Sequence, residues 1–232
     1  MSDLNKDHPN INEEWYNNRK EEFNRILPLF SFPVSLMKER YIMTNDEFDF
    51  LTNLETPGGI HPLGSANRYV LHEPKLKYLQ RYIQRQIEDY AYNILRISTK
   101  TKFRITQSWT NVAEKNKAHH QHKHNNSVIS GVYYISGRDI KIIFQRLPEL
   151  FSGWHFEYDE FNMYNSESYT LSTQKNSTVI FPSSLTHQVA PLQNNTPRIS
   201  LAFNTMVYGH VGDYNKSTEL TLRDDTLVQE TE

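Results

Sequence analysis

The stretch Phe103-Arg-Ile-Thr-Gln-Ser-Trp-Thr110 alternates between apolar and polar residues. Alternation with a period of two is typical of a β-strand that buries one face. Similar short runs, separated by Gly, Asn, Pro or Ser, follow over residues 128–135, 140–144, 177–181 and 198–207. Strands of this kind bury their apolar faces by stacking two sheets. We therefore predict a mainly β fold, a double-sheet sandwich or jelly roll, with helices packed outside it.

The region before these strands predicts a helix over residues 74–95. Its apolar residues recur at steps of three and four, which places them on one face: Leu76, Leu79, Ile83, Ile87, Tyr90, Ala91 and Ile94. We expect this helix to brace the sheet. Around it we predict a polar lead-in over 1–25, a single domain over 26–209, and a polar tail over 210–232.

Composition excludes several classes of protein. The chain has 232 residues, a formal net charge of -2 and no cysteine. It therefore has no disulfide, thiolate metal site or cysteine nucleophile, and its charge gives no electrostatic footprint for nucleic acid. No apolar run is long enough to span a membrane, and no secretory signal is visible. We expect a cytoplasmic protein (host cytoplasm, if phage-encoded) without nucleic-acid or membrane partners.

Four of the ten histidines lie in His119-His-Gln-His-Lys-His-Asn-Asn-Ser127, just before a strand-like run. Residues two apart on an extended chain share a face, so His120, His122 and His124 can point the same way. Two such imidazoles can bind one metal ion, and His187, beyond a Pro-Ser-Ser turn, is a candidate third ligand. The alternative is an exposed polar loop without a specific site.

Arg198 opens the last strand-like run, and Ser200 shares its face. An arginine inside an apolar sheet is costly unless an anion meets its guanidinium. A dicarboxylate would do so through bidentate hydrogen bonds, with the Ser200 hydroxyl as a further donor. The alternative is an edge arginine that pairs with a local acid such as Asp213.

Three blocks of sequence, in order and at matching spacing, resemble the Fe(II)- and 2-oxoglutarate-dependent oxygenases. Within that family, the chain is similar to a prolyl-hydroxylase-like branch found in marine bacteria and their phages. The resemblance runs from about residue 108 to residue 208. The blocks are His122-Lys-His124-Asn-Asn126-Ser-Val-Ile-Ser130-Gly-Val-Tyr-Tyr134, Phe181-Pro-Ser-Ser-Leu-Thr-His187-Gln-Val and Arg198-Ile-Ser-Leu-Ala-Phe-Asn204.

The resemblance implies a cupin-like double-stranded β-helix that holds iron in its mouth. His122 and His187 take the two histidine positions of the iron site. Position 124, where the family usually has Asp or Glu, is a histidine here, which leaves the metal open and gives three imidazole ligands. The pair His120 and His122 is an alternative register for the first two ligands.

The same resemblance implies the cosubstrate site. Arg198 and Ser200 match the pair that holds the distal carboxylate of 2-oxoglutarate. Tyr134 and Asn126 match positions that often contact the cosubstrate or substrate.

Three further residues are candidates for substrate contact. Trp109 and Tyr133 can line the pocket, although strand aromatics are more often core residues. His155 lies in a loop of a size typical of lids or recognition elements, although an ordinary loop residue is the simpler interpretation.

We expect an enzyme that uses Fe(II), 2-oxoglutarate and O₂ to hydroxylate an unactivated C–H bond. Its substrate would be a small molecule or a peptidyl side chain such as proline, the second by analogy of fold only. Two alternatives remain: a cupin-like three-histidine metalloenzyme that does not use 2-oxoglutarate, and a non-catalytic phage structural or binding module. A homodimer is a candidate assembly.

Overall fold

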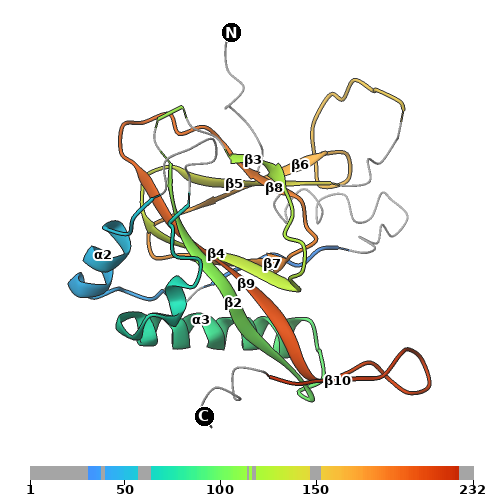
Figure 1. Cartoon of the computed structure of the whole chain (residues 1–232). Helices are drawn as coiled ribbons and strands as arrows, with labels where there is room; N and C mark the ends of the chain where they lie inside the picture. The colour runs from blue at the N-terminus through green and yellow to red at the C-terminus, as the bar shows by residue number, and fades with distance from the viewer. Residues whose placement is uncertain are drawn as a thin grey trace.

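The computed structural model describes residues 31–37, 40–56, 64–113, 115–116, 119–146 and 153–224. The lead-in expected over residues 1–25 and the expected start of the domain at residue 26 lie outside these ranges. Two antiparallel sheets stack on each other, and helices cover one outer face (Figure 1). The mainly β fold with flanking helices is confirmed.

The larger sheet has six strands in the order β1-β7-β4-β9-β10, with β2 paired to β9. Two long strands, β2 and β9, pair with each other and cross the molecule diagonally in Figure 1. The strands are β1 (Ser35–Leu36), β2 (Thr101–Ala113), β4 (Ile129–Ser136), β7 (Thr178–Pro182), β9 (Arg198–Val211) and β10 (Leu220–Leu222).

The smaller sheet has four strands in the order β3-β8-β5-β6. They are β3 (His119–His122), β5 (Ile140–Gln145), β6 (Ser168–Thr173) and β8 (His187–Val189). Chain crossings between the two sheets, such as β4 to β5 and β7 to β8, make the double-sheet arrangement that the sequence predicts.

Helices pack on the outer face of the larger sheet. The predicted helix consists of a 3₁₀ turn (Pro74–Leu76), α3 (Lys77–Asp89) and a π turn (Tyr90–Ile94). Another 3₁₀ turn (Val70–His72) precedes it. The apolar face of α3 packs into one core with the sheet residues Phe103, Ile105, Leu201 and Phe203. Each fully buried side chain of this size contributes roughly 1.5–3 kcal/mol.

A shorter helix, α2 (Asn45–Thr52), begins where its sequence signals it. Thr44 and Glu47 form a capping box: the Glu47 N–H donates to the Thr44 hydroxyl at 3.2 Å, and the Thr44 N–H donates to the Glu47 carboxylate at 2.9 Å. None of the helices in the described ranges is both long and apolar enough to cross a membrane.

The segment after residue 209 differs from the expected polar tail. Strand β9 continues to Val211, and β10 folds back on it, with Leu220 opposite Val211 and Leu222 opposite Gly209. Asp224 forms an ion pair with Arg104 of β2. A hairpin therefore carries the sheet beyond the predicted boundary, because its backbone pairing needs no apolar run that the sequence would reveal.

Candidate metal and carboxylate site

Three histidines from two separated stretches of chain meet at one end of the sandwich. Strand β3 pairs with β8, which places His122 opposite His187. His124 follows β3, and its backbone N–H donates to the Ser183 carbonyl at 3.0 Å. One nitrogen from each of the three imidazoles lies within 4.8 Å of the others, close enough to hold a single ion.

Hydrogen bonds to the backbone decide which nitrogen of two of these imidazoles is available. His122 Nδ1 lies 2.8 Å from the His120 carbonyl oxygen, and His187 Nδ1 lies 2.9 Å from that of Leu185. A carbonyl oxygen only accepts, so Nδ1 carries the proton and donates in both rings. Nε2 is then left with its lone pair, which is how metal-binding histidines are usually oriented.

Burial keeps the three imidazoles neutral. It lowers the pKa of His124 to about 3 and that of His187 to about 4, and it also lowers the pKa of His122. Neighbouring histidines lower these pKa values further, because each disfavours a positive charge on the next. A neutral imidazole is the form that binds a metal ion.

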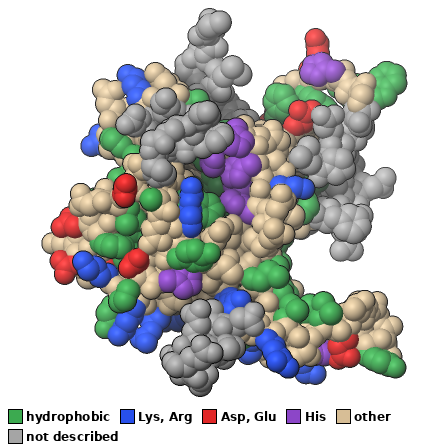
Figure 2. All heavy atoms as spheres, viewed as in Figure 1, with side chains coloured by type: hydrophobic (Ala, Val, Ile, Leu, Met, Phe, Trp, Pro, Cys, Tyr) green, Lys and Arg blue, Asp and Glu red, His purple; other side chains and the backbone are tan. Residues whose placement is uncertain are grey.

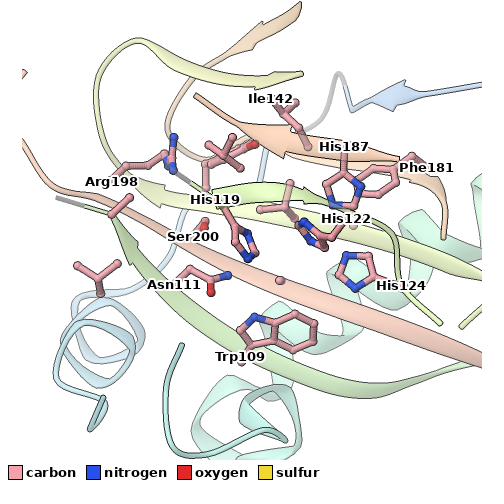
Figure 3. A pocket seen from close by; sticks show the side chains of 17 residues that line it. Trp109, Asn111, His119, His122, His124, Ile142, Phe181, His187, Arg198 and Ser200 are labelled. Carbon is pink, nitrogen blue, oxygen red and sulfur yellow. The ribbon is translucent and has the colours of Figure 1, made fainter. Parts of the chain in front are cut away.

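A cavity of about 60 Å³ runs between the sheets from the histidines to Arg198. Figure 3 shows His122, His124 and His187 gathered at one end, and Arg198 and Ser200 at the other. Side chains of both sheets line it.

Arg198 is a buried cation without a carboxylate partner among the described residues. The residue is 6% exposed, and no described carboxylate lies within 4.0 Å of its guanidinium. Burial lowers its pKa, while the nearby Tyr134 hydroxyl acts in the opposite direction. Asp213, the alternative partner, instead accepts a hydrogen bond from the Asn215 N–H in its own exposed turn.

Strand register places three polar side chains on the cavity face beside Arg198. Ser200 of β9 lies opposite Tyr134 of β4 on one side and Asn111 of β2 on the other. Directly paired residues share a face of the sheet, and all three line the cavity. Ser200 and Tyr134 were predicted. Asn111 was missed, because its position opposite Ser200 appears only once β2 and β9 are paired.

Of the candidates for substrate contact, only Trp109 lines the cavity, and its ring centroid lies 5.9 Å from that of His124. The expectation for Tyr133 is corrected: it lies in the core under the helices, and its hydroxyl donates to the Tyr41 carbonyl at 2.8 Å. Adjacent residues of a strand face opposite sides, so Tyr133 and Tyr134 cannot share the pocket.

Two further predicted residues lie outside the cavity lining. Asn126 is exposed in a tight turn after β3, with a φ of 55°. Such left-handed positions favour asparagine for backbone reasons alone. His155 is exposed in the loop between β5 and β6. Contacts of Asn126 with the cosubstrate and of His155 with the substrate therefore have no support in this arrangement.

A buried polar network that sequence reasoning missed supports His124. The Ser130 and Ser183 hydroxyls lie 2.7 Å apart, Ser130 donates to the Asn204 side chain at 2.8 Å, and Ser183 donates to the Ser127 hydroxyl at 2.8 Å. The carbonyl of Ser183 holds the backbone of His124. The sequence does carry a signal for this network, since small polar residues stand at inward-facing positions of otherwise apolar strands.

The comparisons with known proteins agree with this fold. Residues 107–204 match the family described as "Putative 2OG-Fe(II) oxygenase". A 2OG-Fe(II) oxygenase family oxidoreductase from Burkholderia pseudomallei is similar in fold, with a TM-score of 0.50, 10% identity, and 83% of this chain and 88% of that chain covered. SnoK, an alpha ketoglutarate dependent carbocyclase from nogalamycin biosynthesis, has a TM-score of 0.50, 10% identity, and 86% and 87% covered. No curated protein matches the sequence.

The side chains fit the groups that the family name implies. Three neutral imidazoles suit a divalent transition metal such as Fe(II). A buried guanidinium without a carboxylate partner in the described part of the chain suits a carboxylate such as that of 2-oxoglutarate. All of these side chains fall within the matched residues. Residues 107–204 of the chain therefore match the 2OG-Fe(II) oxygenase family, and the protein is an enzyme of the class that uses Fe(II) and 2-oxoglutarate.

Proposed function

We propose that the enzyme hydroxylates a C–H bond, that His122, His124 and His187 hold its Fe(II), and that Arg198 and Ser200 bind 2-oxoglutarate. The observation that carries the proposal is one cavity with three metal-binding nitrogens at one end and, at the other, a buried guanidinium that no carboxylate of the described residues pairs with. A 2-oxo diacid has complementary groups at its two ends, so it can span such a cavity.

The donor set is unusual for the family, because position 124 is a histidine. With three neutral imidazoles the bound ion keeps its full double positive charge, whereas a carboxylate ligand would reduce that charge by one. Together with Arg198, this leaves a strongly positive cavity that favours a dianion. When bound, Fe(II) supplies the activation of O₂ that converts 2-oxoglutarate into succinate and CO₂ and inserts the second oxygen atom into a C–H bond.

Arg198, Ser200 and Tyr134 orient the cosubstrate. The guanidinium can donate two parallel hydrogen bonds to the distal carboxylate, and Ser200 is a further donor on the same face. Burial raises the pKa of Tyr134, so its hydroxyl stays protonated at neutral pH and can donate to the same carboxylate. These groups fix the diacid without a proton transfer, and no protein general base is required.

The size of the cavity favours a substrate that presents a narrow group. A volume of about 60 Å³ holds about five waters at roughly 10–15 Å³ each, so a bound diacid leaves little room inside the cavity. The oxidised group must then enter from outside the cavity. The Trp109 ring lines the cavity, and the Arg68 guanidinium lies 5.8 Å from the centre of that ring. A peptidyl side chain such as proline meets this requirement, and we propose that substrate class.

The test is formation of succinate from 2-oxoglutarate, followed by mass spectrometry in the presence of Fe(II), ascorbate and O₂. The reaction can proceed slowly without the primary substrate, and we expect iron-dependent succinate from the wild type. His187→Ala should abolish it, whereas His155→Ala, which removes an exposed histidine outside the cavity, should not.

Two outcomes would contradict the proposal and identify the alternatives. Tight metal binding without any effect of 2-oxoglutarate would indicate a cupin-like three-histidine enzyme. A folded wild-type protein that neither binds metal nor forms succinate would indicate a non-catalytic module.

A further inference from the structure

The proposed iron site consists of His122, His124 and His187, called here the inner trio. Two histidines beside it are not used by that site. His119 lines the cavity, and Figure 3 shows it between Arg198 and His122. His120 is exposed. The ring centroids of His119 and His122 lie 4.3 Å apart, those of His119 and His120 5.1 Å, and those of His120 and His122 5.6 Å.

An irregularity in β3 brings these three rings together. In a regular strand His119 and His120 would face opposite sides. Here the register between β3 and β8 shifts, since His119 lies opposite Val189 and His122 lies opposite His187. The extra residue on β3 turns the neighbouring side chains toward one another, as a β-bulge does. One nitrogen from each imidazole lies within 4.8 Å of the others.

The inner trio and the outer trio, which consists of His119, His120 and His122, differ in their access to solvent. The inner set includes His187, which is 4% exposed, whereas the outer set includes the exposed His120 and the half-buried His119. Figure 2 shows a patch of histidine side chains on the molecular surface, within a hollow of this face. An ion that arrives from solvent can therefore reach the outer set first.

His122 belongs to both trios, and its Nδ1 donates to the His120 carbonyl. Only Nε2 remains to bind an ion, and one lone pair serves one ion at a time. Simultaneous three-imidazole coordination at both places is therefore excluded while this hydrogen bond holds.

We propose that His119, His120 and His122 form a second divalent-metal site at the mouth of the cavity, which competes with the inner site for His122. Three imidazoles and no carboxylate favour Fe(II), Co(II), Ni(II), Cu(II) or Zn(II) over Mg²⁺ and Ca²⁺. The site stands independently of 2-oxoglutarate, since none of its ligands is assigned to the diacid.

The test is titration of the metal-free protein with Co²⁺, followed by visible absorbance and isothermal calorimetry without 2-oxoglutarate. His187→Ala removes the inner trio and leaves the outer one intact. We expect this variant to bind one Co²⁺ per chain. Addition of His120→Ala should weaken that binding at least about tenfold, a change of about 1.4 kcal/mol. Addition of His155→Ala, the matched control, should leave it unchanged.

Equal Co²⁺ affinity in the two double variants would overturn the proposal, as would the absence of binding in folded His187→Ala. His124→Ala, which also leaves the outer trio complete, replaces His187→Ala should thermal unfolding show that the latter does not fold. The wild type should bind one Co²⁺ tightly, and two tight ions per chain would refute the competition for His122. These readouts do not depend on succinate, so they fail separately from the proposed oxygenase reaction.

Discussion

Replacement of Arg198 by methionine tests whether this arginine binds a ligand or stabilises the fold. Methionine keeps an unbranched apolar stem of similar length and removes the charge and all donors. Arg198 is 6% exposed and has no carboxylate partner among the described residues. In the variant the metal-free protein therefore loses no ion pair with any described residue, and the buried charge of Arg198 is removed.

Arg198→Met should have opposite effects on 2-oxoglutarate binding and on the stability of the metal-free protein. If the guanidinium binds the diacid, its removal breaks a buried charged pair in the complex, which costs about 3–5 kcal/mol. That cost weakens 2-oxoglutarate binding by roughly a hundredfold to several thousandfold. The metal-free protein should be unchanged or more stable by about 1 kcal/mol, a rise of about 2–4 °C in Tm for a domain of this size.

The assay combines calorimetry of 2-oxoglutarate binding to Ni(II)-loaded protein, which does not turn over, with thermal unfolding of the metal-free protein. Arg85→Met, an exposed position on α3, is the matched control and should leave both quantities unchanged. Unaltered 2-oxoglutarate affinity in Arg198→Met would refute the carboxylate role. A fall of several kcal/mol in metal-free stability would show that Arg198 is a structural ion-pair residue.

Three further substitutions test the surroundings of the site. Tyr134→Phe should leave Tm nearly unchanged and weaken 2-oxoglutarate binding about two- to tenfold in the same calorimetry, the worth of one hydrogen bond; no loss would exclude its hydroxyl from the site. Ser183→Ala removes the contacts of this hydroxyl with those of Ser130 and Ser127 and should cost about 1–3 kcal/mol of unfolding free energy. It should also weaken the affinity for Co²⁺, because the loop that holds His124 loosens; full metal affinity would contradict that link. Gly131→Ala would place its Cβ against the Phe203 ring and 2.7 Å from the Val179 carbonyl oxygen, so denaturant unfolding should show a loss of about 1–3 kcal/mol; an unchanged midpoint would mean that the sheet gives way freely there.

The strands and the helix were predictable because their signals are local. The alternation in residues 103–110 and the three- and four-residue steps of α3 each mark the buried face of one element. Such a pattern can be read from a short stretch of sequence. The hairpin that ends in β10 was not predictable, since an exposed edge strand needs backbone partners more than apolar side chains.

The site was predictable only in part. Sequence patterns brought forward His122, His124, His187, Arg198 and Ser200, and the structure gathers all of them around one cavity. The resemblance to a family supplied the pairing of His122 with the remote His187, which no local pattern contains.

Other features of the site depend on details that only the folded chain has. Alternation shows that Tyr133 and Tyr134 face opposite sides, but it does not show which side is the cavity. The shift in β3 that joins His119 to the other histidines depends on strand pairing, as does the polar network behind His124.

The most direct test of the central claim is an anaerobic titration of the metal-free enzyme with Fe(II) and 2-oxoglutarate, recorded by visible absorbance. We expect a charge-transfer band that needs both components, disappears in His187→Ala and requires a far higher 2-oxoglutarate concentration in Arg198→Met. A band that forms with Fe(II) alone, or that persists unchanged in either variant, would contradict a diacid held between three imidazoles and a guanidinium.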